Sequence, residues 1–169
     1  MIICSLGYGY VAKYLLRELS YAGVIAIGVT SKEIKKNECL PSNLKIYSSQ
    51  YTKESINYST HLLITAPPTE KGCPIFLKYL KDIKNSNITN VAYISSTGVY
   101  GNYNGKWVNE NSELKGKSKK AKNRKLAEGQ WSDFCIDHKL HYNIFRLGSI
   151  YGPDRLNSFG KKKIIIKKE

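Results

Sequence analysis

The sequence predicts an α/β protein built on a doubly wound parallel β-sheet. Short apolar segments typical of strands alternate with segments whose apolar residues recur at the spacing of an amphipathic helix. Several strand segments are uninterrupted apolar runs, as in strands buried on both faces of a parallel sheet. This order implies right-handed β-α-β crossovers, and ligands of such sheets bind at the carboxyl ends of the strands.

The first β-α-β unit takes up the N-terminal 29 residues. Residues 1–6 form an apolar strand, and residues 10–22 carry apolar side chains at helical spacing. Gly23 ends this helix, and residues 24–29 form the second strand.

The middle of the chain gives weaker signals before the sheet resumes. Residues 32–60 are polar and mixed, with one weak strand at residues 44–47. Residues 61–66 form a buried strand that two prolines close. The remaining predicted elements are a helix marked by Phe76, Leu80 and Ile83, a strand at 91–95, a helix at 119–138 and a strand at 142–147.

The turn after the first strand has the pattern Gly-x-Gly-x-x-Ala. Gly7 permits a tight turn, Gly9 lets the backbone approach a pyrophosphate, and Ala12 allows close packing of helix on strand. Tyr10 and Val11 begin the helix, whose N-terminus offers free N–H groups to phosphates. Between a strand and a helix this pattern predicts a Rossmann-type dinucleotide site. A tight turn that binds nothing is the alternative.

The residues after the second strand bear on the type of cofactor. A carboxylate about 20 residues beyond the glycine loop would bond the ribose of NAD. The sequence has Thr30, Ser31 and Lys32 there, whose hydroxyls and ammonium suit a 2′-phosphate, and Glu33 lies beyond the strand end. The sequence therefore favours NADP over NAD. A polar turn without selectivity is the alternative.

Three further segments follow predicted strands in the order of a known family. They read Leu-Ile-Thr-Ala-Pro-Pro at residues 63–68, Ser-Ser-Thr-Gly-Val-Tyr-Gly at 95–101 and Phe-Arg-Leu-Gly-Ser-Ile-Tyr-Gly-Pro at 145–153. With the glycine loop, they resemble the extended short-chain dehydrogenase/reductase family, which includes NAD-dependent epimerases and dehydratases. The resemblance implies that Ala66 and Pro67 flank the cofactor.

The resemblance also implies three catalytic positions, of which two depart from the family. Ser96 stands where the family polarises a substrate hydroxyl or carbonyl. With Glu128 as the anchor, Arg124 takes the Lys position of the family's Tyr-x-x-x-Lys pair and Lys120 takes the Tyr position. Lys120 would act as a base only if the like charge of Arg124 lowered its pKa. A helix start that merely carries charge is the alternative.

Atypical members of the family also lack this Tyr, and residues 105–110, Gly-Lys-Trp-Val-Asn-Glu, resemble them. Their reactions are mostly unassigned, so the resemblance implies no substrate. Extended members carry a C-terminal substrate region, which we expect to be missing from this sequence. We expect an NAD(P)-binding domain over residues 1–157, a basic tail over 158–169, and truncation. A split gene, with a companion chain that supplies the C-terminal part, or a degraded gene would explain the truncation. In either case we expect the sheet to expose apolar surface.

Composition restricts the other classes of partner. The net charge is +14, mostly from lysine and clustered at residues 115–125 and 161–168. Lys, Asn, Ile and Tyr are abundant together, as an AT-rich coding sequence would produce, so a nucleic-acid partner is not expected. Four widely spaced cysteines predict neither a metal site nor a disulfide framework. Without a signal peptide or an apolar run of about 20 residues, we expect a cytoplasmic protein with no membrane partner.

These observations predict an NAD(P)-binding protein of the epimerase/dehydratase type. If the protein is an enzyme, the resemblance implies hydride transfer at a hydroxyl-bearing substrate. One alternative is a non-catalytic dinucleotide-binding module that senses redox state or regulates a partner. A basic nucleic-acid binder is the other.

Overall fold

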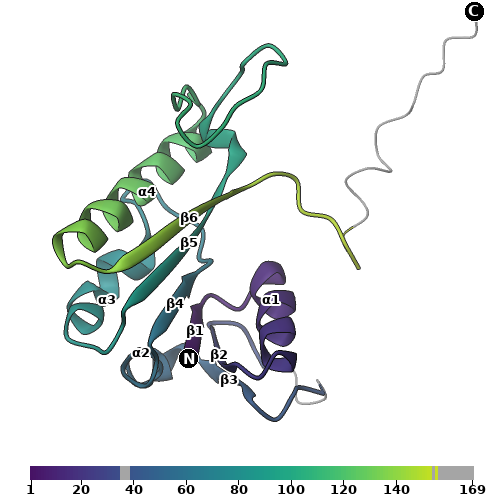
Figure 1. The fold of residues 1–169 in the computed structure, drawn as a ribbon, viewed down its shortest axis with the longest axis vertical. Helices are drawn as coiled ribbons and strands as arrows, with labels where there is room; N and C mark the ends of the chain where they lie inside the picture. Colours follow the sequence, from purple (N-terminus) through teal and green to yellow (C-terminus); the bar gives the residue numbers. More distant parts are fainter. Residues whose placement is uncertain (35–38, 154, 156–169) are drawn as a thin grey trace, which may run out of the picture.

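A single parallel sheet organises the chain. The structure is a computed structural model that describes residues 1–34, 39–153 and 155. Within these residues, six parallel strands form one sheet with the order β3-β2-β1-β4-β5-β6, flanked by helices (Figure 1). This confirms the predicted doubly wound α/β fold, because the chain crosses over each time between parallel neighbours. The predicted basic tail at residues 158–169 lies outside the described residues.

The predicted elements are present, with one addition. The strands are β1 (Ile2–Leu6), β2 (Ile25–Thr30), β3 (Leu44–Ser48), β4 (His61–Ile64), β5 (Asn90–Ser96) and β6 (His141–Leu147). The helices are α1 (Tyr10–Tyr21), α2 (Thr52–Tyr58), α3 (Pro74–Lys84) and α4 (Lys119–Asp137), with short 3₁₀ helices η1 (Ser49–Tyr51) and η2 (Thr97–Val99). The sequence did not predict α2, which lies in the stretch interpreted as polar and mixed.

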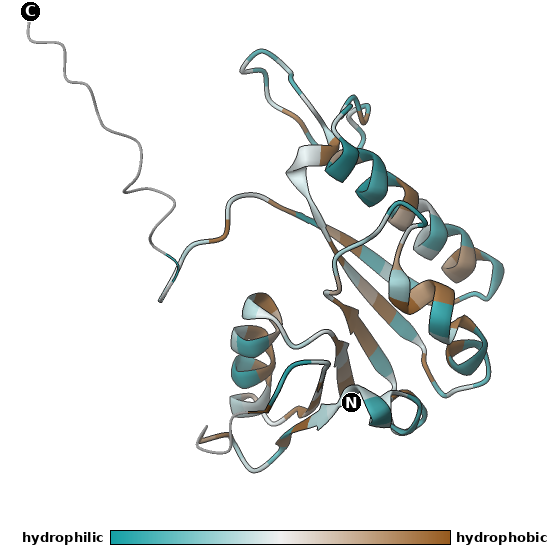
Figure 2. Ribbon diagram, turned by 180° about the vertical axis from the view of Figure 1, so that it is seen from behind, coloured by the Kyte–Doolittle hydropathy of each residue, from teal (hydrophilic) through white to brown (hydrophobic). Residues whose placement is uncertain are grey.

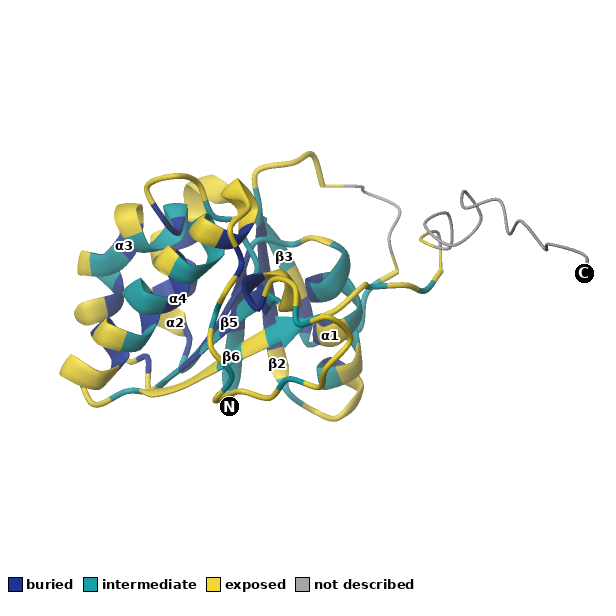
Figure 3. Cartoon of the chain, turned by 90° about the horizontal axis from the view of Figure 1, so that it is seen from above, coloured by how far each residue is buried: buried dark blue, intermediate teal, exposed yellow. Residues whose placement is uncertain are grey.

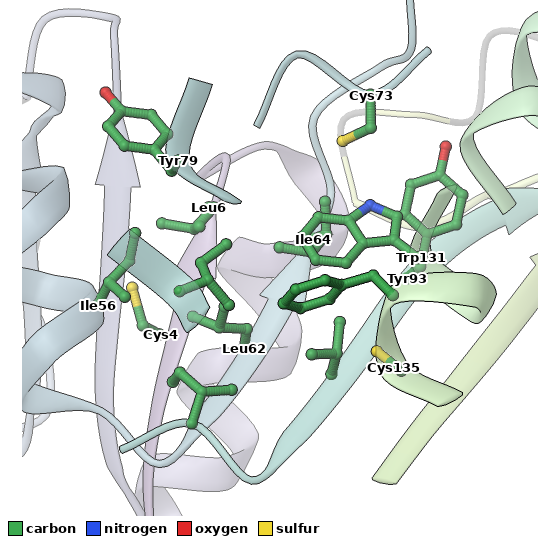
Figure 4. Packing of buried hydrophobic residues seen from close by; sticks show 14 of the residues in the cluster. Cys4, Leu6, Ile56, Leu62, Ile64, Cys73, Tyr79, Tyr93, Trp131 and Cys135 are labelled. Atoms are coloured by element: carbon green, nitrogen blue, oxygen red, sulfur yellow. The ribbon is translucent and has the colours of Figure 1, made fainter. Parts of the chain in front are cut away.

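Two hydrophobic clusters lie on opposite faces of the sheet. Helices α2, α3 and α4 cover one face, and α1 lies on the other (Figure 3). The larger cluster fills the space under α2, α3 and α4 and includes Tyr93, Trp131 and Cys135 (Figure 4). The smaller one, under α1, is formed by Leu16, Ala26 and Leu44. Hydrophobic residues accordingly concentrate in the central strands, whereas the helices carry hydrophilic bands (Figure 2).

One part of the sheet is covered on a single face. Along β5, buried residues alternate with half-buried ones, and the half-buried set includes Ala92 and Ile94. Phe145 of β6 pairs with Ile94 and is 48% exposed. In a parallel α/β sheet both faces are ordinarily covered. The face of β5 and β6 opposite α4 therefore exposes apolar side chains, as the sequence predicted.

In the described part of the chain, no helix combines the length and apolar character needed to cross a membrane.

Candidate functional site

The glycine loop is held tightly against the neighbouring strand. Gly7 has a φ of +109°, in the region that favours glycine, and a Cβ there would lie 2.6 Å from Thr65 Oγ1 and 3.0 Å from the backbone nitrogen of Ala66. The Thr65 hydroxyl donates to the Gly7 carbonyl at 2.5 Å, and the Gly7 N–H donates to the Val29 carbonyl at 3.1 Å. At the ends of β1, β2 and β4, position 7 therefore requires a glycine for two reasons: the positive φ, and the lack of space for a Cβ.

The N-terminus of α1 opens toward this loop without a cap. Gly9 is the N-cap residue, no side chain caps the helix, and its first turn carries no acidic side chain. A Cβ at Gly9 would meet nothing within 4 Å, whereas Ala12 is fully buried against the sheet. The N–H groups of the first turn have no acceptor inside the helix. Such a helix end binds anions through its N–H groups and its dipole.

A cleft of about 550 Å³ joins this helix end to the carboxyl ends of the strands. Most of the site residues predicted from the sequence line it. They are Gly7, Gly9, Tyr10, Val11, Thr30, Ser31, Lys32, Ala66, Pro67, Ser96 and Arg124. The structure adds lining residues that sequence reasoning missed, which are Tyr8, Thr65, Ile94, Ser95, Leu147, Gly148, Ile150 and Arg155.

A second cavity, of about 580 Å³, lies at β2, β3 and α2, away from the glycine loop. Its walls include Ile25, Tyr51 and Tyr58, and it shares no residue with the cleft. Because ligands of parallel α/β sheets bind at the carboxyl ends of the strands, the cleft is the candidate functional site.

The charge of the cleft is positive. Lys32, Arg124 and Arg155 line it, and its described lining residues include no Asp or Glu. Lys32 is exposed at the end of β2, where its backbone N–H donates to Thr30 Oγ1 at 3.0 Å. This contact folds the turn and leaves the ammonium group in solvent. Three cations without a lining carboxylate favour a ligand that carries several negative charges.

Two serines stand at the end of β5 in different environments. Ser96 caps η2, because its hydroxyl oxygen accepts from the Gly98 N–H at 3.2 Å. That bond leaves the Ser96 O–H free to donate. Ser95 is buried, and its hydroxyl has no hydrogen-bond partner among the described residues.

The two cations of the predicted catalytic pair are separated. Arg124 reaches the cleft, where one terminal nitrogen donates to the Ile94 carbonyl at 2.5 Å and to the Tyr93 hydroxyl at 3.3 Å. Burial raises the pKa of Tyr93 to about 12 although Arg124 opposes the shift, so this phenol stays protonated at neutral pH. Lys120 lies in the first turn of α4, exposed, and does not line the cleft.

A buried ion pair fixes the loop that follows Ser96. Arg146 of β6 donates from Nε to both carboxylate oxygens of Glu128 at 3.2 Å, and from a terminal nitrogen to one of them at 2.9 Å. Its other terminal nitrogen donates to the Tyr100 hydroxyl at 3.0 Å. Hydrogen bonding to Glu128 raises the pKa of Arg146. Glu128 therefore holds α4, β6 and this loop together, a role that the sequence did not predict.

In the described part of the chain, no three His, Cys, Asp or Glu side chains gather where a metal ion could bind. The cleft instead offers N–H groups, hydroxyls and cations, which are groups that bind phosphates and sugars.

Comparisons by sequence and by structure give different results. No protein-family model matches this sequence, and no curated protein matches it. Among solved structures, a protein of unknown function from Silicibacter pomeroyi is similar with a TM-score of 0.80 and 31% identity, over 91% of this chain and 55% of its own. The UDP-N-acetylglucosamine 4-epimerase of Methanobrevibacter ruminantium M1 has a TM-score of 0.74 and 18% identity, over 90% and 56%.

A UDP-glucuronic acid 4-epimerase from Bacillus cereus, solved in complex with NAD, has a TM-score of 0.67 and 15% identity, over 90% of this chain and 58% of its own. These likenesses confirm the Rossmann-like fold, and the similar structures include NAD-dependent epimerase/dehydratase proteins. The chain spans little more than half the length of the structures that it matches.

Proposed function

We propose that the cleft binds a nicotinamide dinucleotide, with the diphosphate at the N-terminus of α1. One observation carries this proposal: an uncapped helix end beside Gly9 opens into a cleft that three cations and no carboxylate line. Free N–H groups and a positive dipole end are what a diphosphate requires. The complex of the Bacillus cereus epimerase with NAD supports the same class of ligand.

The cofactor is NADP in preference to NAD. Thr30, Ser31 and Lys32 line the cleft at the end of β2, where a carboxylate would select the ribose of NAD. Lys32 supplies a charge for the 2′-phosphate, and the Ser31 hydroxyl supplies a hydrogen-bond donor.

Fluorescence titration with NADPH and NADH tests this proposal. The protein should bind NADPH more tightly than NADH, and Lys32→Gln should weaken NADPH binding about tenfold while NADH binding stays the same, because only NADPH has the 2′-phosphate. The matched control is Lys122→Gln, which removes an exposed charge from α4 outside the cleft. Equal affinity for the two nucleotides would remove the NADP preference, and binding of neither would remove the proposed function.

Hydride transfer is the second candidate function. It is favoured by Ser96 and Arg124, which line the same cleft, with the Ser96 O–H free to donate to a substrate carbonyl. The Arg124 guanidinium offers N–H donors that can orient a substrate. NADPH oxidation by carbonyl substrates that is lost in Ser96→Ala would support an enzyme, whereas tight binding with no turnover supports a non-catalytic module.

A companion polypeptide covers the exposed face of β5 and β6. The half-exposed Phe145 and the length of the similar structures, of which this chain matches little more than half, support this part of the proposal. We also propose a cytoplasmic location, with which four free cysteines are in accord.

The unmatched part of the Silicibacter pomeroyi protein, produced separately, is a usable probe for this surface. It should form a 1:1 complex with this chain in light scattering, and Phe145→Asp should abolish the complex by burying a charge against apolar surface. Tyr58→Asp, an exposed aromatic on α2, is the control, and circular dichroism checks that both variants are folded. No complex with the unaltered chain, or equal binding by Phe145→Asp, would contradict the proposal.

A further inference from the structure

The segment after β6 returns to the start of α1. It leaves the carboxyl end of β6, lines the cleft through Gly148 and Ile150, and reaches Tyr10 at the start of α1. The Tyr10 hydroxyl donates to the Pro153 carbonyl at 3.1 Å. A Cβ at Gly152 would clash with the Tyr10 hydroxyl oxygen. The first residue of α1 is therefore in close contact with residues more than 140 positions along the chain.

Arg155 is held directly over that residue. Its guanidinium carbon lies 4.9 Å from the centroid of the Tyr10 ring, within the range of a cation–π contact. The Arg155 backbone N–H donates to the Gly152 carbonyl at 3.0 Å, which closes the turn that carries the side chain. Arg155 lines the cleft together with Gly9 and Val11.

This arrangement brings two positive groups to the same space. The N-terminus of α1 carries the positive end of the helix dipole, and its first turn has no acidic side chain. A guanidinium beside that end is unfavourable unless an anion lies between the two. A planar guanidinium can donate two parallel hydrogen bonds to phosphate oxygens.

We infer that Arg155 binds the diphosphate of the nucleotide from the side opposite the N-terminus of α1, and that Tyr10 is its positioning residue. The inference rests on the proposed function and deepens it, because it gives different phosphates to different cations. Lys32 stands at the end of β2 and serves the 2′-phosphate. Arg155 stands at the end of α1 and serves the diphosphate.

Three nucleotides separate these two roles by calorimetric titration. ADP-ribose has the diphosphate without a 2′-phosphate, adenosine 2′-monophosphate has the 2′-phosphate without any phosphate at the 5′ position, and NADPH has both. Arg155→Gln should weaken ADP-ribose and NADPH about tenfold and the monophosphate less than twofold. Lys32→Gln should weaken NADPH and the monophosphate and leave ADP-ribose unchanged. Lys122→Gln should leave all three unchanged.

Variants of Tyr10 test its positioning role. Tyr10→Ala removes the ring under Arg155 and should weaken ADP-ribose by about the same factor as Arg155→Gln, with little further loss in the double variant. Tyr10→Phe keeps the ring under Arg155 and loses the hydroxyl that bonds Pro153, so it should bind ADP-ribose within about twofold of the unaltered protein.

Several results would overturn the inference. One is that Arg155→Gln binds ADP-ribose as tightly as the unaltered protein does. Another is that Arg155→Gln loses the same factor in affinity for all three nucleotides, which would indicate a structural role for Arg155. If the unaltered protein binds none of the three, the proposed function fails with it. Normal ADP-ribose binding that Arg155→Gln does not change removes this inference alone.

Discussion

At the scale of single residues, the buried carboxylate of Glu128 connects α4 to β6 and to the loop after Ser96. It accepts three hydrogen bonds from Arg146, whose remaining nitrogen reaches Tyr100 in the loop after Ser96. Both partners are shielded from solvent, with side-chain exposures of 17% for Arg146 and 5% for Glu128. A buried pair of this kind need not add net stability, but removing one partner leaves an uncompensated charge.

Glu128→Gln should therefore lower the free energy of unfolding by about 3 kcal/mol, because Arg146 stays charged and loses its counter-ion. Urea denaturation followed by circular dichroism measures the change. Glu113→Gln is the control, since its ion pair with Lys115 is exposed and should matter little. A Glu128→Gln variant as stable as the unaltered protein would show that the loop is held by other contacts.

Some residues of the candidate site could be predicted from the sequence, and others could not. Gly7 and Gly9 could be predicted because their roles follow from local backbone geometry. Arg155 could not, since its place over Tyr10 depends on a contact between the two ends of the described chain. Lys120 and Arg124 are one helical turn apart, and spacing alone gave no reason to separate them. The structure separates them because Lys120 is exposed at the start of α4, whereas Arg124 reaches the Ile94 carbonyl at the end of β5.

At the scale of elements, the prediction succeeded where apolar periodicity is strong. The strands β1, β2 and β4 are nearly continuous apolar runs, and their ends agree with the structure to within two residues. Helix α2 was missed because it has a single aliphatic residue, Ile56, and buries Thr52 and Ser55 beside it. These hydroxyls donate hydrogen bonds to backbone carbonyls of the preceding residues, as Ser55 does to the Tyr51 carbonyl at 2.7 Å. The buried face of α2 is therefore largely polar, so apolar periodicity did not indicate a helix there.

At the scale of the whole molecule, the order of elements was sufficient to predict a doubly wound parallel sheet, and the structure supplies the order of its strands. Right-handed crossovers between buried strands leave few arrangements, and the observed sheet is one of them. The single-sided cover of β5 and β6 was predicted as exposed apolar surface, and the structure shows which side chains form it. The division of the hydrophobic residues into two clusters was not predicted, because it depends on which face each helix takes.

The two clusters should respond differently to a ligand. Helix α1 rests on Leu16, Ala26 and Leu44, whereas α3 and α4 share the larger cluster around Trp131. Hydrogen exchange followed by mass spectrometry should show faster exchange in α1 than in α4 without nucleotide, because fewer buried contacts hold α1. NADPH should slow exchange in α1 more than in α4. Equal exchange in both helices would contradict this difference.

The hydrophobic cluster under α1 should therefore affect the apparent affinity for the nucleotide. The helix that would receive the diphosphate must be closed on the sheet to present its N–H groups, and each opening of the helix removes a binding-competent molecule from the population. Leu16 is fully buried and does not line the cleft, yet Leu16→Ala would lower the closed fraction and with it the apparent affinity. On the proposed function, affinity for the nucleotide would in this way be linked to local folding, through a buried residue that does not line the cleft.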